Sequence, residues 1–334
     1  MRKFWGKIKN FFIKIKPSKR KIVQLYTALL YNANIKGFFS GRIYKGVTKN
    51  VCVPGLNCYS CPGAIGACPL GSLQNAVSAS GVRTPAYVLG IIALFGLLLG
   101  RTICGWFCPV GLGQELLYKI KTPKLKKSKA TRVLSYLKYF ILLTFVVIIP
   151  LSFAIPAFCE YICPAGTLEG GVGLLANVVN AGSLGLLGPI FTWKFTLLVV
   201  IVVASIFIFR VFCRFLCPLG ALYGFFSKIA LLGIKLDENK CTDCGLCVGV
   251  CKMDVKKVGD HECIQCGECI SVCPAKAITW KGKSLFVRAN DVDMPASTEM
   301  KPLAGMLKRA PTKADEQQEI SAQNPVEKGG NADE

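Results

Sequence analysis

The C-terminal third of the chain contains CTDCGLCVGVC at residues 241–251 and CIQCGECISVCP at residues 263–274. Both runs have the spacing C-x2-C-x2-C-x3-C, and the second closes with Pro274. In bacterial ferredoxins with this spacing, three thiolates of a short loop bind one [4Fe-4S] cluster and the fourth cysteine of the run binds the other cluster. The sequence therefore predicts an α+β domain of the bacterial 2[4Fe-4S] ferredoxin type at residues 237–280.

The crossed pairing assigns four thiolates to each of the two clusters. One set is Cys241, Cys244, Cys247 and Cys273, and the other set is Cys251, Cys263, Cys266 and Cys269. Two structural zinc sites would also use four thiolates each, but zinc sites do not need this triple-then-single spacing. Lys252 stands where bacterial ferredoxins usually have a proline, a change that alters packing beside Cys251 without removing a ligand.

The part of the chain before this domain has the hydropathy of a membrane protein. The mean hydropathy over all 334 residues is +0.45. Four apolar segments approach the ~20 residues that span a bilayer, at residues 22–39, 85–100, 139–156 and 193–209. Residues 22–39 are interrupted by Asn32, Asn34 and Lys36 and alone would suit an amphipathic surface helix. We therefore predict an α-helical integral membrane protein with about four transmembrane helices, in a transmembrane domain at residues 22–236.

Lysine and arginine are distributed as topology signals along this domain. Residues 2–21 contain nine Lys or Arg and no acid, residues 119–138 contain eight and no acid, and residues 156–193 contain none. Because cytoplasmic loops carry the excess of basic residues, we expect a multi-pass protein of the cytoplasmic (inner) membrane. The basic N-terminus at residues 1–21 and the cysteine domain then both face the cytoplasm.

A six-span arrangement is the alternative to four spans. Residues 171–191 are uncharged and long enough to cross, although they are rich in glycine. If they cross, residues 219–236 must cross as well to keep the cysteine domain inside, and Lys228 would lie in the membrane. That cost favours four spans.

The formal net charge of +22 raises the question of nucleic-acid binding. The basic residues lie in blocks beside apolar segments rather than on a compact domain with interleaved aromatic residues. Each cluster held by four thiolates would also bring roughly two negative charges. We therefore expect the lipid bilayer as a partner and no nucleic acid, and we interpret the polar residues 281–334 as a disordered cytoplasmic tail.

A Cys-Pro-x-Gly element recurs through the apolar domain, as CPLGSL, CPVGLG, CPAGTL and CPLGAL. The four copies begin at Cys68, Cys108, Cys163 and Cys217. Three copies have a cysteine four residues upstream, at Cys104, Cys159 and Cys213, whereas Cys52, Cys58 and Cys61 precede the first copy. Proline after cysteine suits the first turn of a helix, where the positive N-terminal end stabilises a thiolate.

The predicted topology sorts these cysteines into two groups. Cys104, Cys108, Cys213 and Cys217 fall at the inner face, and Cys52, Cys58, Cys61, Cys68, Cys159 and Cys163 fall at the outer face. The hydrocarbon core is about 30 Å thick, so an electron carrier that crosses it needs relays near both faces. We hypothesise one or two further iron–sulfur clusters there. Outer disulfides, or Cys-Pro as a simple helix start, are the alternatives.

His261 is the only histidine of the chain and directly precedes the second cysteine run. Its imidazole is either solvated or able to tune a cluster. A b-type haem held by two histidines is excluded, and no C-x-x-C-H haem attachment motif occurs.

Over residues 20–280 the chain resembles the membrane polyferredoxins that include the NapH-type quinol dehydrogenase component, the C-terminal half of NosR-type proteins and the cytochrome oxidase accessory reductase. The resemblance rests on the C-x3-C-P pairs at Cys104, Cys159 and Cys213, followed by the double cluster run. It implies electron transfer between a quinol or cytoplasmic donor and a partner redox protein. Residues 58–68 are an elaboration found in part of that family.

Electron transfer requires no catalytic acid or base, and we predict a subunit of an oxidoreductase rather than a stand-alone enzyme. The alternative is a metal-ion reductase or assembly factor, in which Cys58 and Cys61 bind a soft ion such as Cu(I). A redox sensor lacks any recognisable output domain. Quinol oxidation needs proton acceptors, and Glu115, Glu160 and Glu169 lie only at the edges of the predicted spans.

Overall fold

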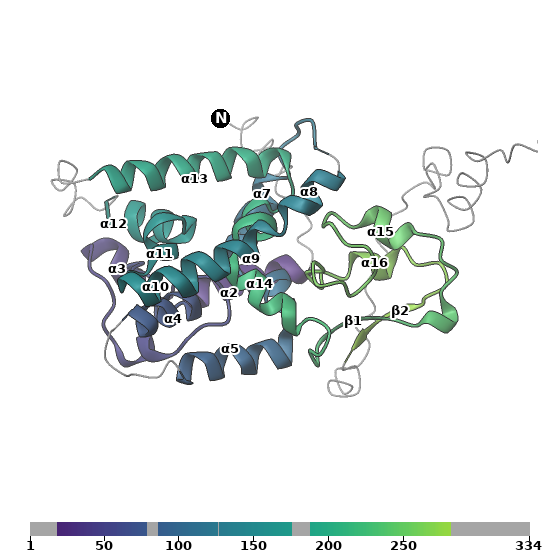
Figure 1. The fold of residues 1–334 in the computed structure, drawn as a ribbon, viewed down its shortest axis with the longest axis horizontal. Coiled ribbons are helices and arrows are strands. Elements are labelled where there is room, and N and C mark those ends of the chain that lie inside the picture. The colour runs from purple at the N-terminus through teal and green to yellow at the C-terminus, as the bar shows by residue number, and fades with distance from the viewer. Residues whose placement is uncertain (1–18, 79–85, 126, 176–187, 282–334) are drawn as a thin grey trace, which may run out of the picture.

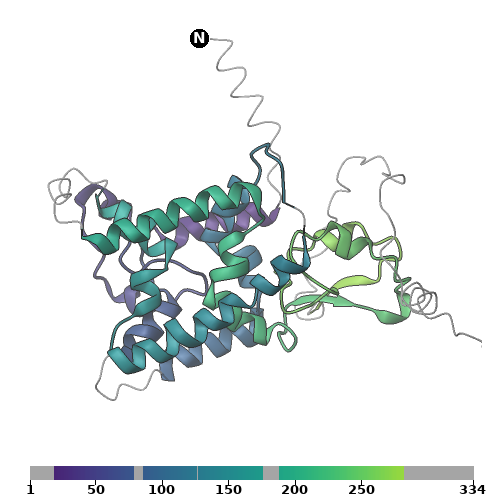
Figure 2. The same ribbon diagram turned by 45° about the horizontal axis from the view of Figure 1, so that its top comes forward.

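The computed structural model describes residues 19–78, 86–125, 127–175 and 188–281. These form a helical body and, from residue 233, a small α+β module at one end of it (Figures 1 and 2). The predicted tail at 281–334 falls outside the described residues from 282 onward, as do residues 1–18 of the basic N-terminus. The main helices of the body are α2 (Lys19–Tyr31), α3 (Ile35–Ser40), α4 (Pro69–Ser78), α5 (Ala86–Leu99), α6 (Thr102–Trp106), α7 (Pro109–Leu117), α8 (Lys129–Leu134), α9 (Leu137–Ile141), α10 (Ile149–Phe153), α11 (Ala157–Tyr161), α12 (Gly173–Leu175), α13 (Pro189–Phe207) and α14 (Pro218–Phe226).

The described residues of the body include three π-helical segments, η2 (Leu142–Ile148), η3 (Gly166–Val172) and η5 (Phe212–Leu216). The first lies inside one continuous apolar helix, Ala130–Phe153. The other two carry or follow cysteines of the repeated element, in line with the tendency of π-helical turns to occur at functional sites.

Two helices of the described residues are long and apolar enough to cross a membrane, Ala130–Phe153 and Pro189–Phe207. The helix Ala86–Leu99 is apolar but shorter. Residues 22–39, predicted as one span, are instead two helices separated at residues 32–34. The asparagines cause the break, because Asn32 donates to the Asn57 side chain at 3.1 Å and Asn34 donates to the Pro62 carbonyl at 2.9 Å. About four spans are therefore not confirmed. The competing span at 171–191 lies largely outside the described residues.

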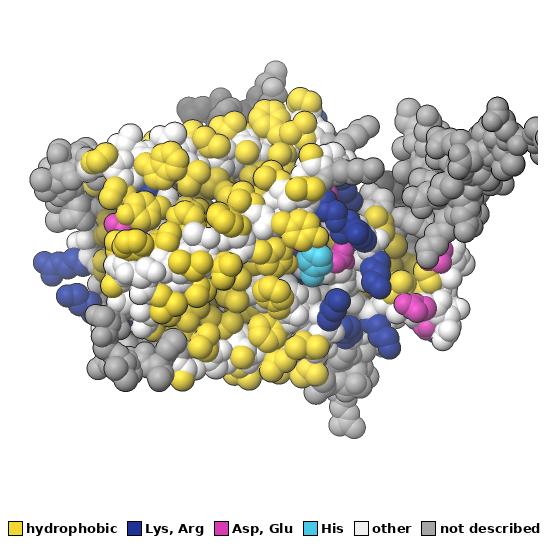
Figure 3. All heavy atoms as spheres, viewed as in Figure 1, with side chains coloured by type: hydrophobic (Ala, Val, Ile, Leu, Met, Phe, Trp, Pro, Cys, Tyr) yellow, Lys and Arg dark blue, Asp and Glu magenta, His cyan; other side chains and the backbone are white. Residues whose placement is uncertain are grey.

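The surface of the body is unusually apolar (Figure 3). Large side chains stand exposed on α5, on the helix 130–153 and on α13, among them Tyr87, Phe140, Leu151, Phe153 and Trp193. Basic side chains gather near the boundary with the module. Monomers in water rarely expose continuous apolar surface on this scale. The interior contains most of the Cys-Pro cysteines, packed with Leu70, Ile103, Phe158 and Phe212.

The module begins with β1 (Gly233–Leu236), which pairs antiparallel with β2 (Ile278–Lys281), so that Ile234 faces Trp280 across the ladder. Between the strands lie η6 (Glu238–Lys240), α15 (Leu246–Val250) and α16 (Glu268–Ser271). Gly245 and Gly267 follow the second cysteine of each run with φ of 70° and 85°, a conformation that glycine adopts without strain. The α+β architecture predicted for this part of the chain is present.

Candidate metal centres

The first module site is a cavity of about 200 Å³ whose lining includes Cys241, Cys244, Cys247 and Cys273. The first three come from one loop and the fourth comes from the end of the second run. The structure thus brings together the four thiols that the crossed pairing assigned to one cluster. Lys256 and Lys257 also line this cavity, and they place positive charge beside thiolates.

The second module site is formed by Cys251, Cys263, Cys266 and Cys269. These thiols lie near enough to interact electrostatically, since Cys269 is affected by the other three. Burial raises the pKa of the Cys263 and Cys266 thiols, and a bound metal would favour their deprotonated form. Cys251 and Cys263 pack with Phe209 and Met253 at the boundary between module and body.

The inner site comprises Cys104, Cys108, Cys213 and Cys217. Cys108 and Cys217 are the N-cap residues of α7 and α14, with proline at the first helical position of each, which confirms the predicted helix starts. The thiol of Cys217 accepts the Gly220 amide at 3.4 Å and is close to the other three cysteines. The four residues predicted for this face are therefore side by side.

Two buried arginines flank the inner site. The Arg210 guanidinium lies against the first turn of α7, where a Cβ added to Gly111 would come within 3.0 Å of the guanidinium. The same guanidinium donates a hydrogen bond to the Cys104 carbonyl at 2.6 Å. The Arg101 guanidinium lies against α14, where a Cβ on Gly220 would be 3.5 Å from Nη2. The buried Nε and Nη2 of Arg101 have no hydrogen-bond partner in the part of the chain that the structure describes. An anionic group held by the four thiolates would satisfy this charge, so the residues fit an iron–sulfur cluster.

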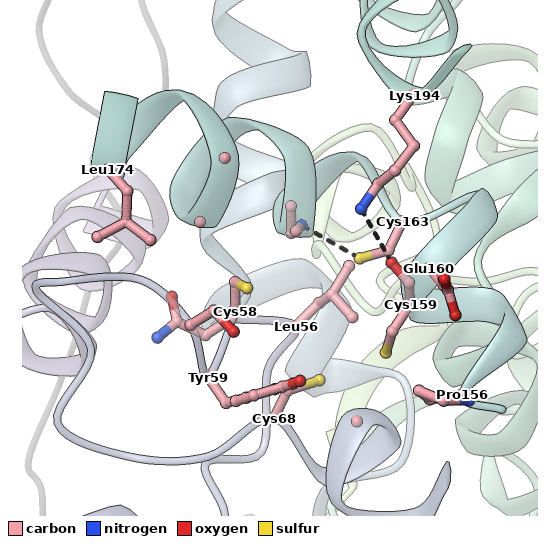
Figure 4. A pocket seen from close by; sticks show the side chains of 17 residues that line it. Leu56, Cys58, Tyr59, Cys68, Pro156, Cys159, Glu160, Cys163, Leu174 and Lys194 are labelled. Atoms are coloured by element: carbon pink, nitrogen blue, oxygen red, sulfur yellow. Dashed lines mark hydrogen bonds between the residues drawn. The ribbon is translucent and has the colours of Figure 1, made fainter. Parts of the chain in front are cut away.

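The outer site is a cavity of about 440 Å³ lined by four cysteines (Figure 4). They are Cys58, Cys68, Cys159 and Cys163, and their sulfur atoms face a common space. A Cβ on Gly170 would come within 3.2 Å of the Cys58 sulfur, and one on Gly71 within 3.7 Å of the Cys159 sulfur. The absence of side chains at these glycines leaves room around the thiols, and the donor set fits a second cluster in the body.

Two cysteines predicted for the outer group do not line this cavity. Cys52 is held in the bridge to Ala67, and Cys61 is buried, with its amide bonded to the Cys58 carbonyl at 3.1 Å. All eighteen cysteines lie within the described residues and are free, so the outer disulfides of the alternative interpretation are not formed. Within the same residues, no group of three or more His, Cys, Asp or Glu side chains is placed so that it could hold a single metal ion.

The acidic residues near the body sites have distinct environments. The Glu169 carboxylate accepts the Cys58 amide at 2.7 Å, and burial raises its pKa to about 7 despite this hydrogen bond. Glu160 lines the outer cavity. Burial alone would raise the pKa of Glu115, but Arg210 and Arg20 lower it below its usual value. Sequence reasoning placed these acids at the edges of spans and missed that two of them are buried.

Short contacts connect the outer site to the inner site. A Cβ on Gly55 would come within 3.4 Å of the Cys108 Cα, and the adjoining Leu56 and Cys58 line the outer cavity. The Tyr223 hydroxyl, on α14, donates to the Pro54 carbonyl at 2.9 Å. One loop, residues 54–58, therefore touches both sites.

The inner site is equally close to the module. A Cβ on Gly105 would lie 2.1 Å from the Ile264 carbonyl oxygen, and Trp106 donates to the Gln265 carbonyl at 3.0 Å. Cys104 packs into the same apolar cluster as Cys263. Cysteines of the inner site and of the second module site are thus neighbours across the boundary.

A buried ionic network holds this boundary together. Glu262 pairs with Arg101 at 3.1 Å and also with Lys138. Arg101 donates further to the His261 carbonyl at 2.6 Å, and the half-buried His261 ring lies 2.6 Å from Asp260. His261, whose role the sequence left open, is therefore part of this contact. The pairing partners of the network could not be predicted from motif spacing, whereas Arg101 and Arg210 each stand three residues before the first cysteine of an inner pair, a regularity that the sequence prediction missed.

Comparison with protein families gives matches over both parts of the chain. One 4Fe-4S binding domain matches residues 81–128, 137–179 and 190–237, each containing one C-x3-C-P pair. Another 4Fe-4S binding domain matches residues 234–257 and 258–279. No solved structure matches.

Several curated proteins are similar in sequence. The uncharacterized protein MJ0750 of Methanocaldococcus jannaschii is 31% identical over 57% of this chain and 74% of its own length. The putative electron transport protein YccM of Escherichia coli is 29% identical over 47% of this chain and 43% of its own. The ferredoxin-type protein NapH of Haemophilus influenzae is 29% identical over 48% of this chain and 51% of its own. The chain thus spans about half the length of the latter two relatives.

The repeated thiolate sites and the matched domains define an iron–sulfur protein of the ferredoxin type, with a role in electron transfer. The chain belongs to the membrane polyferredoxin family, as the resemblance of its motifs implied.

Proposed function

We propose that this protein conducts electrons across the cytoplasmic membrane along a row of four [4Fe-4S] sites. In order, these are the first module site, the second module site, the inner site and the outer site, with the ligands described above. The single observation that carries this proposal is the set of close contacts that joins them, from Ile264 against Gly105 to Gly55 against Cys108. When bound, the clusters supply reversible one-electron redox chemistry.

The chain's own residues hold the four sites, and three of the four inner-site cysteines are buried away from water. Cys-Pro helix starts aim backbone amides at the thiols, and Arg101 and Arg210 compensate negative charge in the buried inner site. The network around Glu262 fixes the module against the body. These groups act by positioning, and no catalytic acid or base takes part.

The apolar surface supports placement of the body in a lipid bilayer with the module in the cytoplasm. The helices 86–99, 130–153 and 189–207, together with 19–40, would make four membrane segments, of which the last is broken. The basic residues near the module agree with a cytoplasmic boundary. The inner site then lies near the cytoplasmic face and the outer site near the opposite face.

We infer that the donor is a quinol or a cytoplasmic redox protein and that the acceptor is a redox partner, with the protein acting as a subunit of a larger oxidoreductase. Similar proteins support such a setting, since MauN of Paracoccus denitrificans is a methylamine utilization ferredoxin-type protein. The lysines at the first module site would suit an acidic cytoplasmic donor.

Iron and acid-labile sulfide per chain test this function directly. The protein is purified anaerobically in mild detergent, and the reduced sample is examined by EPR. Four clusters give about sixteen irons per chain, because each holds four. About twelve irons per chain would mean that one of the two body sites holds no cluster. About eight irons per chain would overturn the transmembrane path and leave a two-cluster ferredoxin attached to a membrane domain.

A further inference from the structure

A polar residue occupies the sixth position after each Cys of the Cys-Pro elements, buried in three copies and half-buried in the third copy along the chain. These residues are Gln74, Gln114, Glu169 and Tyr223. Each forms a hydrogen bond to a segment other than its own helix, and in three cases that segment carries a cysteine of the same site. The recurrence shows that the sixth position crosslinks the two halves of a site.

Gln114 shows the complete arrangement at the inner site. Its Oε1 accepts the Phe212 amide at 2.9 Å, and its Nε2 donates to the Cys213 sulfur at 3.2 Å. One side chain from α7 therefore fixes the backbone before the facing C-x3-C pair and also contacts the thiol of its first cysteine.

Gln74 repeats half of this arrangement at the outer site. Its Oε1 accepts the amides of Phe158 and Cys159 at 3.1 and 3.4 Å. The side chain is fully buried, and its Nε2 has no partner among the described residues. Cys159 is the counterpart of Cys213, because each is the first cysteine of the pair that faces the glutamine. An unpartnered buried amide is costly, so a thiolate acceptor is expected at this position.

We propose that Gln74 and Gln114 are equivalent positioning residues that donate a hydrogen bond to a ligand thiolate, Cys159 or Cys213, and so set the potentials of the outer and inner clusters. This rests on the proposed function, which supplies the two clusters. A donor to a ligand sulfur stabilises the additional negative charge of the reduced cluster and raises its potential. Loss of the donor therefore lowers the potential of the cluster on that side only.

The test is redox titration of Gln74→Met and Gln114→Met in the full-length, cluster-loaded protein, followed by EPR. Methionine keeps the length of the side chain and has no N–H donor. Gln74→Met should lower the midpoint potential of the outer cluster and leave the inner one unchanged, and Gln114→Met should do the reverse. Signals are assigned with Cys159→Ser and Cys213→Ser, and each glutamine variant is the matched control for the other.

The result is separable from the proposed function. Full iron content with unchanged potentials, or with equal shifts at both sites, overturns the role of the glutamines and leaves the electron path intact. Eight irons in the unsubstituted protein overturn the path instead. If a methionine variant loses its cluster, pulsed EPR of the reduced, unsubstituted protein labelled with 15N-glutamine tests the donor directly. Coupling of a glutamine 15N to the inner and outer clusters is expected, and its absence overturns the proposal.

Discussion

The inner site and the outer site are built from the same repeated element, yet their electrostatic surroundings differ. Arg101 and Arg210 are buried beside the inner thiols. Among the described residues, no arginine lines the outer cavity, which instead lies near half-buried Glu169, with Lys194 on one side. The Cys-Pro element therefore provides ligands at both sites, whereas Cys58, which replaces the upstream cysteine of a pair, and the neighbouring charges distinguish the outer site from the inner one.

The difference in charge between the two sites predicts which cluster is reduced more easily. Positive groups stabilise a reduced, more negative cluster, and a buried carboxylate opposes it once ionised. We expect the inner cluster to have the higher midpoint potential. Potentiometric titration of the unsubstituted protein checks this order, and an outer cluster with the higher potential would contradict it.

The largest expected effect follows removal of one ligand from each site. Cys213→Ser and Cys159→Ser should each lose about four irons per chain, because a cubane seldom persists with a ligand missing. Cys61→Ser is the matched control, since Cys61 is buried beside the outer site without lining its cavity. Iron analysis checks all three variants, and a comparable loss in Cys61→Ser would contradict the assignment of ligands.

Arg210→Met should be nearly as damaging, and only at the inner site. Arg210 bonds the Glu115 carboxylate at 2.7 Å, and breaking a buried ion pair costs about 3–5 kcal/mol. Both the free energy of unfolding in detergent and the inner-site iron should fall. Chemical denaturation followed by circular dichroism measures the first. Unaltered stability would show that Arg20 alone compensates Glu115.

Gly105→Ala should push the module away from the inner site, and iron analysis checks that both sites keep their clusters. The new Cβ would meet the Ile264 carbonyl at 2.1 Å, so backbone must move. Freeze-quench EPR should show slower reduction of the inner cluster after the module is reduced. Gly113→Ala on α7 is the control, because no other atom lies within 4 Å and alanine favours a helix by about 1 kcal/mol. Equal rates in the two variants would argue against transfer across this contact.

Lys194→Met should have the smallest effect, confined to the outer site. Lys194 lines the cavity and donates to the Cys159 carbonyl at 3.2 Å. Loss of its positive charge should slightly lower the outer midpoint potential and leave the inner potential unchanged. Redox titration detects this change, and a shift at the inner cluster would show that the sites are not electrostatically separate.

Spacing along the chain allowed much of this protein to be predicted. The α+β module, the grouping of its eight cysteines and the Cys-Pro helix starts depend on local geometry, in which a few residues determine a loop or a first helical turn. The sequence also separated the inner four cysteines from the outer group. It did not predict the break at residues 32–34, because that break depends on hydrogen bonds to a loop more than 20 residues away.

The sequence by itself determined the chemistry of the protein. It shows cysteines in groups of four, Cys-Pro elements that begin helices, and an apolar chain around them. Only the tertiary structure decided which four of the six outer cysteines share a cavity, and which charges surround each site. The reason is physical. Burial and long-range pairing, such as Arg101 with Glu262, join residues far apart in sequence, and the spacing of the cysteine motifs does not show which residues pair.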